Sequence, residues 1–222
     1  LNEFAKAAEL YDSRDFGSDS SVFQAHMLAR QGRLSNALEL LRKRPLNPTS
    51  IRLAGQIYFL QGDYSDAAEH FEMFAARFPN NVRVQAYYVS SLLAAEQVEK
   101  ASELLANLPK PLKESPLFLT FRSQVALYNT DYDLALELSQ KARAAGLESN
   151  ILRVVTAVSS FEKKNYEMAF KMLSALEGMA KENPNIKSLL ILSKSHLGYS
   201  VDSDIKGYVS DEYATQEDKL TL

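Results

Sequence analysis

The sequence contains no cysteine, only three histidines and no long apolar run in its 222 residues. Without cysteine the chain can form neither a disulfide framework nor a thiolate metal site, and its compartment stays open. No apolar stretch reaches about 18 residues, so we expect no membrane-spanning helix and no membrane insertion. The composition predicts a soluble protein, with the cytoplasm slightly favoured and the periplasm still possible.

Side chains that could build a catalytic or metal site are also sparse. His26, His70 and His196 lie far apart in the sequence and do not show metal-ligand spacing. The chain has no glycine-rich phosphate loop, no Gly-x-Ser-x-Gly motif and no cysteine nucleophile. We therefore predict no catalytic, cofactor-binding or metal-binding residues and no enzyme activity within this chain.

The charge balance is that of an ordinary surface. Lys and Arg number 25 against 28 Asp and Glu, a net charge of −3. Since there is no basic excess, a nucleic-acid partner is not expected. Hydrophobic residues make up 46% of the chain, which is enough for a continuous core.

A repeating pattern of apolar and small residues runs through the chain. An apolar residue opens the second helix of each predicted helix pair: Leu34, Tyr64, Val98, Tyr132 and Tyr166. The spacing between the first two of these residues is slightly shorter than the other three spacings, which are equal. Three residues after each of them is an alanine: Ala37, Ala67, Ala101, Ala135 and Ala169. Nine residues before each of them stands a residue that is small in four of the five cases: Ala25, Gly55, Val89, Ser123 and Ala157. This regularity predicts stacked copies of one structural unit.

The stretch from Ile51 to Pro79 shows what that unit is. Its key positions are Gly55, Tyr58, Ala67, Phe71 and Pro79, while Ile51 and Ala54 replace the usual Trp and Leu. The stretch resembles one tetratricopeptide repeat (TPR), a helix–turn–helix unit whose period matches the equal steps of the pattern. The resemblance implies an all-α, right-handed α-solenoid of antiparallel helix pairs that form a TPR-like superhelix, because a single helix pair cannot bury its own apolar face.

Four segments are expected along the chain. Residues 1–17 form an N-terminal helix, either a cap or the end of a preceding repeat, and residues 18–184 form five TPR-like helix pairs. Residues 185–198 form a C-terminal capping helix. Residues 199–222 form an acidic polar tail, predicted to be disordered or loosely docked. Alternatively, Tyr199, Ile205, Tyr208, Val209 and Tyr213 pack back on the array, or the tail occupies the groove. Because the chain begins at Leu1 and the array begins part-way through, we expect a fragment of a longer protein.

The TPR resemblance implies that the first helix of each pair lines the concave face and binds a peptide or a partner helix. The residues expected to bind, carried over by register, are Arg52, Gln56, Phe59, Arg83, Ser90, Leu93, Gln124, Leu127, Tyr128, Val158 and Phe161. Phe59, Tyr128 and Phe161 are favoured because aromatic side chains concentrate binding energy.

We therefore expect a scaffold in a multiprotein assembly whose partner is a protein or peptide. The alternatives are a structural subunit that self-associates as a homo-oligomer, and the partner-recruiting region of a larger enzyme. One TPR activity is disfavoured. The clamp that holds acidic chaperone tails needs Lys, Asn and Arg on three successive first helices, and of the matching positions only Arg83 fits.

Overall fold

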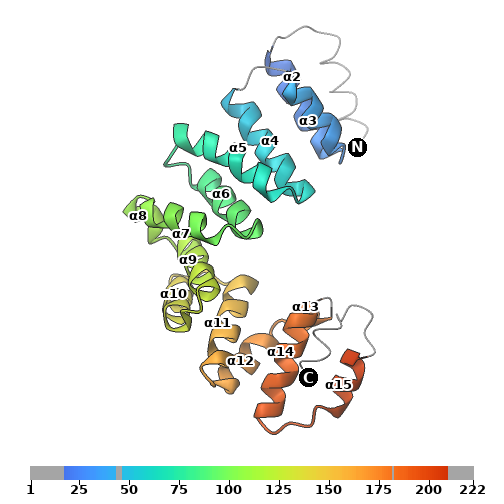
Figure 1. Cartoon of the computed structure of the whole chain (residues 1–222), viewed down its shortest axis with the longest axis vertical. Helices are drawn as coiled ribbons and strands as arrows, with labels where there is room; N and C mark the ends of the chain where they lie inside the picture. The colour runs from blue at the N-terminus through green and yellow to red at the C-terminus, as the bar shows by residue number, and fades with distance from the viewer. Residues whose placement is uncertain (1–17, 44–46, 182, 210–222) are drawn as a thin grey trace. The chain divides into compact units, whose positions relative to one another are not determined.

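The computed structural model describes residues 18–43, 47–181 and 183–209, and helices are the only regular elements within these ranges. Figure 1 shows a succession of short helices joined by tight turns. The chain divides into two compact units, Leu1–Leu112 and Lys113–Leu222. The division falls next to Pro109 and Pro111, which fix φ and follow the third helix pair. The predicted all-α fold class is confirmed for the described residues.

Unit 1 contains three helix pairs, each with a first helix and a second helix. The first helices are α2 (Ser18–Arg30), α4 (Pro48–Gln61) and α6 (Val82–Ala94), and the second helices are α3 (Leu34–Arg42), α5 (Tyr64–Arg77) and α7 (Val98–Asn107). The short helix α8 (Lys110–Lys113) lies at the boundary between the units. The N-terminal helix expected in residues 1–17 lies outside the described residues.

Unit 2 continues the alternation. Its first helices are α9 (Pro116–Tyr128), α11 (Asn150–Glu162) and α14 (Pro184–His196), and its second helices are α10 (Tyr132–Ala144), α12 (Tyr166–Ser174) and α15 (Asp202–Val209). The four-residue helix α13 (Glu177–Ala180) lies between α12 and α14. None of the helices in the described ranges combines the length and the apolar character that crossing a membrane requires.

The turn inside each pair has one backbone geometry. In five of the six described pairs the residue two positions before the second helix adopts the left-handed conformation, as Gly62 does with φ of 84°, and before α15 the left-handed residue stands four positions ahead of the helix. Gly62 N–H donates to the Phe59 carbonyl and Asp63 N–H donates to the Tyr58 carbonyl, the two bonds of a Schellman motif. Glycine accepts this φ without strain, but three turns place other residues there: Glu96, Thr130 and Lys164, with φ between 57° and 61°.

The small residues of the repeat form the contact between the two helices of each pair. The five alanines that the repeat pattern places on the second helices are completely buried. Gly55 of α4 lies against α5 so closely that an added Cβ would be 3.0 Å from Phe71 Cε1 and 3.2 Å from His70 Cβ. The one polar residue at the Phe71 position of the repeat, Ser139, is buried and lies 3.2 Å from the Thr156 hydroxyl. Small side chains at these positions let the helices pack closely.

The last helix pair is α14 with α15, in the region expected as a capping helix and an acidic tail. Gly198 lies one repeat period after Lys164 and repeats its turn, with φ of 81° and the same two backbone hydrogen bonds. Helix α15 then packs on α14 through Ile205 and the fully buried Tyr208, which contacts Ile191. Residues 202–209 are therefore helical, and residues 210–222 lie outside the described residues.

Candidate functional site

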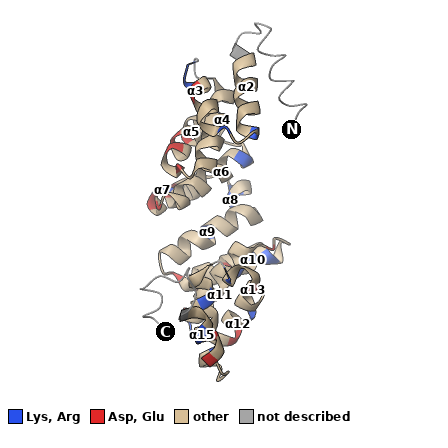
Figure 2. Ribbon diagram, turned by 90° about the vertical axis from the view of Figure 1, so that its right-hand side faces the viewer, with Lys and Arg blue, Asp and Glu red and all other residues tan. Residues whose placement is uncertain are grey.

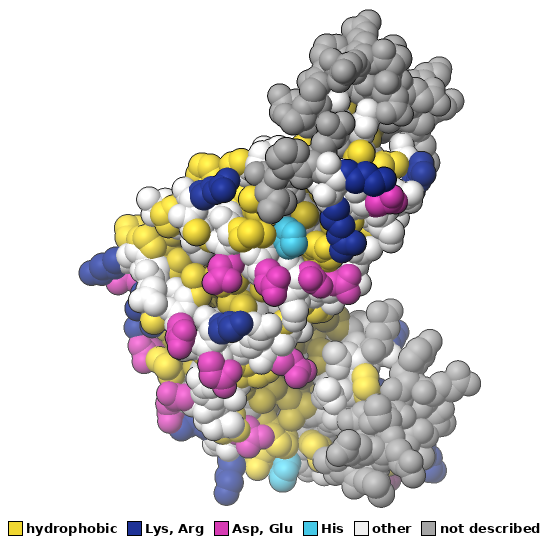
Figure 3. Space-filling model, turned by 45° about the horizontal axis from the view of Figure 1, so that its top comes forward, with side chains coloured by type: hydrophobic (Ala, Val, Ile, Leu, Met, Phe, Trp, Pro, Cys, Tyr) yellow, Lys and Arg dark blue, Asp and Glu magenta, His cyan; other side chains and the backbone are white. Residues whose placement is uncertain are grey.

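The first helices of unit 2 form an apolar groove, which we call the α9–α11–α14 groove. It encloses about 400 Å³, and α13 closes one side. Its apolar lining is supplied mainly by these helices: Leu127, Tyr128, Ile151, Val154, Val155, Val158, Leu173, Met179, Ile186 and Leu189. Tyr128 is 56% exposed, Ile151 44% and Met179 42%, so the groove presents large apolar side chains to solvent. Figure 3 shows such hydrophobic side chains among the polar ones on the molecular surface in view.

The polar side chains of the same groove are all uncharged carboxamides. They are Gln124 of α9, Asn150 of α11, and Asn183 and Asn185 at the start of α14. Asn150 Nδ2 lies 3.2 Å from Met179 Sδ, which joins α11 to α13 across the groove. Gln124 Oε1 is buried and accepts no hydrogen bond from the described residues.

Unit 1 has a groove of different character, the α2–α4–α6 groove. It encloses about 340 Å³ and is lined by His26 and Arg30 of α2, by Gln56, Phe59 and Leu60 of α4 among others, and by Tyr87 of α6. The Phe59 ring lies edge-on to Tyr87 at 5.9 Å and edge-on to Tyr64 at 5.3 Å, so it is fixed by its neighbours.

Two arginines lie at or beside this groove, Arg30 in its lining and Arg52 next to Gln56. Burial, together with the nearby Arg30 and Arg52 guanidinium groups, lowers the pKa of His26 below its usual value. Arg52 also points along α4 toward Gln56, with Nη1 3.4 Å from Oε1. The neutral imidazole is therefore favoured at this position.

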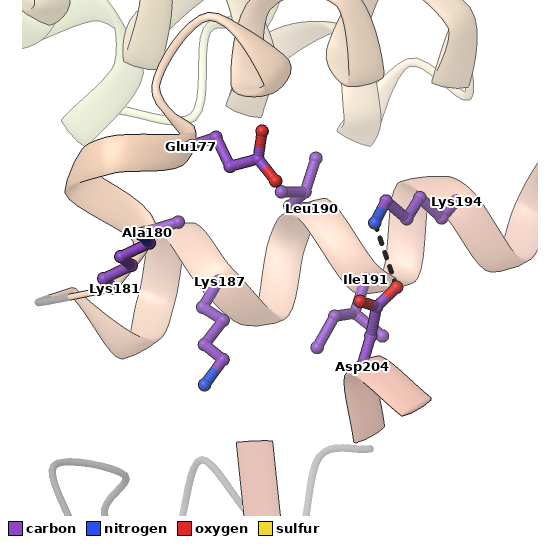
Figure 4. Close-up of a pocket in the computed structure, with 8 residues that line it drawn as sticks. All are labelled: Glu177, Ala180, Lys181, Lys187, Leu190, Ile191, Lys194 and Asp204. Atoms are coloured by element: carbon purple, nitrogen blue, oxygen red, sulfur yellow. Dashed lines mark hydrogen bonds and ion pairs between the residues drawn. The ribbon is translucent and has the colours of Figure 1, made fainter. Parts of the chain in front are cut away.

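A third cavity, of about 220 Å³, lies where α13, α14 and α15 meet (Figure 4). Lys194 Nζ forms an ion pair with Asp204 at 2.9 Å, and Lys187 Nζ lies 5.5 Å from the centre of the Tyr208 ring. These contacts join α14 to α15. We therefore assign this cavity to the packing of α15 and not to a ligand.

The structure brings together several of the residues that the sequence suggested for binding. Gln124, Leu127, Tyr128 and Val158 line the α9–α11–α14 groove, and Gln56 and Phe59 line the α2–α4–α6 groove, with Arg52 beside Gln56. Arg83 is exposed on α6 and Ser90 is half-buried there, and neither lines these cavities. That these residues contact a partner stays a prediction.

Two of the suggested residues are engaged inside the protein. Leu93 is only 7% exposed and belongs to the core of unit 1. Phe161 packs edge-on against Tyr166 and His196, whose own rings stack at 4.1 Å. Both side chains therefore offer little free surface.

Sequence reasoning missed the rim of the α9–α11–α14 groove. Ile151 and Asn150 open α11, and Met179 belongs to α13, a helix with no counterpart between the other described helix pairs of unit 2. The repeat register gives no signal for residues on an irregular element. Within the described residues, no three His, Asp or Glu side chains gather in a way that could hold a metal ion.

Comparison with family models decides the family. Two models described as tetratricopeptide repeat match residues 24–82 and 58–125. The chain is a tetratricopeptide-repeat protein. TPR repeats are generally protein-interaction modules and not catalytic domains. A sequence search among curated proteins gave no match.

Solved structures with the same fold extend the likeness over the whole chain. A chain of the APC/C hetero-tetramer Cut9–Hcn1 matches with a TM-score of 0.75 and 14% identity, over 100% of this TPR protein and 45% of that chain. PilF of Pseudomonas aeruginosa matches with a TM-score of 0.69 and 14% identity, over 99% of this chain and 97% of that one. Yeast Tom70 matches with a TM-score of 0.55 and 16% identity, over 99% of this chain and 57% of that one. The chain thus spans less than half of the Cut9–Hcn1 chain, and its fold is that of TPR solenoids.

Proposed function

We propose that this TPR protein is a non-enzymatic scaffold that binds a peptide or a partner helix against its first helices, as part of a multiprotein assembly. The observation that carries the proposal is the α9–α11–α14 groove. It combines exposed apolar side chains with uncharged amides in one concave site, which is the usual composition of a ligand-binding cleft.

The exposed apolar surface supports a macromolecular ligand. Burying apolar surface contributes roughly 25 cal/mol per Å². Tyr128, Ile151 and Met179 are each more than two-fifths exposed, so a partner that covers them gains hydrophobic free energy. Clustered exposure of this kind, rimmed by polar residues, is typical of interaction sites.

The amides suggest how a ligand backbone is held. Gln124 lines the groove, and the carboxamide group of its side chain can both donate and accept hydrogen bonds. Asn150 and Asn185 stand at the groove with groups that both donate and accept, which suits the alternating N–H and C=O groups of an extended segment. We therefore favour an uncharged, apolar peptide segment for this groove.

The structural neighbours agree with a place in an assembly. The Cut9–Hcn1 structure is a hetero-tetramer, and one of its chains has the same fold as this protein. At 14% identity that likeness concerns the fold alone. The partner of this chain must therefore be found by experiment.

The test is a pull-down with three forms of the full chain. The groove variant carries Tyr128→Ser, Ile151→Ser and Met179→Ser. The control variant carries Leu134→Ser, Met168→Ser and Met73→Ser, which remove exposed apolar side chains from second helices. Phe59 and Phe161 are left intact because both pack against neighbouring rings, so their loss would perturb the fold.

The proposal requires capture by the wild type and the control variant, and loss with the groove variant at unchanged helix content. Equal capture by all three forms would place the binding surface elsewhere. Absence of any partner, with a mass in sedimentation that rises with concentration, would favour a self-associating structural subunit instead.

A further inference from the structure

The five methionines of the chain differ sharply in their access to solvent. Met27 and Met172 are buried, whereas Met73, Met168 and Met179 are each between 36% and 42% exposed. Met73 lies on α5 and Met168 on α12, which are second helices, and neither lines a cavity described above. Among the methionines, all of which lie in the described ranges, Met179 alone is both exposed and part of a groove lining.

The helix that carries Met179 is fixed to the core of unit 2. Met179 belongs to α13, the four-residue helix that closes one side of the α9–α11–α14 groove. Leu176 and Ala180, which flank Met179 in the chain, are buried and belong to one hydrophobic cluster with residues of α12 and α14. The backbone at position 179 is therefore held in place while its side chain lines the groove.

The sulfur of Met179 faces a hydrogen-bond donor from the neighbouring helix. Asn150 Nδ2 of α11 donates to Met179 Sδ at 3.2 Å. The orientation of this amide follows from Arg153, whose Nη1 donates to Asn150 Oδ1 at 3.1 Å, because a guanidinium group can only donate. A thioether is a weak acceptor, so the amide donor of Asn150 is only weakly engaged.

Oxidation of this sulfur changes both its polarity and its hydrogen bonding. A peroxide transfers one oxygen atom to a lone pair of the sulfur, so that the O–O bond breaks and an S–O bond forms. The sulfur is oxidised by two electrons, and hydrogen peroxide is reduced to water. The sulfoxide is polar, and its oxygen accepts hydrogen bonds more strongly than a thioether does. Asn150 Nδ2 already stands where it can donate to that oxygen.

We propose that Met179 is an oxidation site that regulates the α9–α11–α14 groove. The groove binds apolar segments while Met179 is a thioether, and it loses affinity for them when a peroxide converts Met179 to the sulfoxide. Methionine sulfoxide reductases reverse this step, so the groove can return to its first state. This inference rests on the proposed function, that the groove binds a protein segment, and adds its regulation.

The composition of the groove makes it sensitive to one new polar group. Its lining includes no Lys, Arg, Asp or Glu, the residue types that Figure 2 colours blue and red. Its polar side chains are carboxamides, and its remaining lining is apolar. An apolar ligand that covered the sulfoxide would separate a strong acceptor from water, which is unfavourable.

The experiment uses Nile red, an uncharged apolar dye, as the probe and therefore needs no identified partner. The full chain is titrated with the dye before and after treatment with dilute hydrogen peroxide, and peptide mass spectrometry locates the oxidised methionines. The wild type is compared with Met179→Leu and with Met73→Leu/Met168→Leu, which removes the exposed methionines of the second helices. Each form is its own reference. The Tyr128→Ser/Ile151→Ser variant identifies the part of the dye signal that comes from the groove.

We expect peroxide to weaken binding of the dye to the groove by about fivefold in the wild type and in Met73→Leu/Met168→Leu. This factor corresponds to the loss of hydrophobic burial over the exposed part of one methionine side chain. Met179→Leu should show no such change, and a methionine sulfoxide reductase should restore the wild type. The inference is overturned if oxidised Met179 leaves the dye affinity unchanged, if Met179→Leu loses affinity as the wild type does, or if Met179 is oxidised no faster than the buried Met172.

Asn150 supplies a second readout. Its side-chain amide protons, observed by NMR of the nitrogen-15-labelled chain, should move downfield on oxidation of the wild type and stay in place in Met179→Leu, because the sulfoxide is the stronger acceptor. An unchanged Asn150 signal in the oxidised wild type would contradict the proposed contact.

Failure of the proposed function is seen elsewhere. It appears in the pull-down with the unoxidised chain, as equal capture by the wild type and the groove variant, whatever peroxide does to the dye. Only one result would remove both proposals together. That result is a dye signal of the untreated wild type equal to that of Tyr128→Ser/Ile151→Ser, because the groove would then not bind apolar ligands at all.

Discussion

Thr130 provides the sharpest test of the repeat geometry. It occupies the left-handed turn position between α9 and α10, with φ of 57°. A β-branched residue is poorly suited to this conformation, and a non-glycine residue there costs about 1–3 kcal/mol. Thr130→Gly removes that strain and adds about 0.4–1 kcal/mol of chain entropy to the unfolded state. The net expectation is a gain of about 1 kcal/mol in the free energy of unfolding of unit 2.

Two substitutions test whether the backbone angle is the cause. Gly62 holds the same turn position between α4 and α5, and nothing lies within 4 Å of an added Cβ. Gly62→Thr therefore introduces the strain with no clash and should lose about 1–3 kcal/mol. Thr49 is exposed in the first turn of α4, where an ordinary helical φ applies. There the same Thr→Gly change should lower stability by up to about 1 kcal/mol.

The assay is thermal and urea unfolding of the full chain, followed by circular dichroism. A change of about 1 kcal/mol moves the melting temperature of a domain this size by about 4 °C. Stabilisation by Thr130→Gly together with destabilisation by Thr49→Gly and Gly62→Thr supports the geometry. If Thr130→Gly lowers stability as Thr49→Gly does, the turn is not left-handed in solution and the reasoning is wrong.

Three further outcomes follow from buried groups. Ala135→Leu overpacks the completely buried contact between α9, α10 and α11 and should cost about 1–3 kcal/mol in thermal unfolding, whereas Ala144→Leu at an exposed position of α10 should not. Tyr208→Ala removes the fully buried ring of α15, so hydrogen exchange should lose protection in residues 202–208 and keep it in α11; retained protection of α15 would contradict the packing. Burial and the nearby Glu72 raise the pKa of Tyr88 to about 12, so ultraviolet titration should show this phenol ionising after the others. Since the unfolded phenol ionises near pH 10, the stability that the neutral buried phenol contributes is fully present below pH 10 and is lost as pH rises toward 12; a loss complete by pH 10 would refute it.

The sequence predicted the packing of the repeats well, because the signal lies in small residues at fixed spacing. Every second-helix alanine of the repeat register is completely buried, as are Ala25, Val89, Ser123 and Ala157 on the first helices. The same register positions are buried in each repeat, since the same two helices of a pair meet there. Periodicity alone is therefore enough to find these contacts.

What escaped prediction depends on geometry that the residue types do not reveal. Glycine marks the left-handed turn at Gly62, but Thr130 adopts the same conformation without that marker in the sequence. The repeat register also failed to predict helix α15. Ser203 stands near the position of the expected alanine and is exposed, and Tyr208 supplies the buried contact instead. The step of one repeat period from Lys164 to Gly198 was the available signal.

The two units share one packing pattern but differ in the residues that line their grooves. Pro109 and Pro111 lie near the point where the chain splits into two compact parts, between a unit whose groove lining includes His26 and Arg30 and one whose groove lining is uncharged. In both units the fold depends on buried residues between first and second helices, the small contact residues among them. The outward positions of the first helices are free of that constraint, so their chemistry can differ between units. We therefore propose that exposed groove residues such as Tyr128 set specificity, while the completely buried Ala67 and Ala135 hold the helix pairs together.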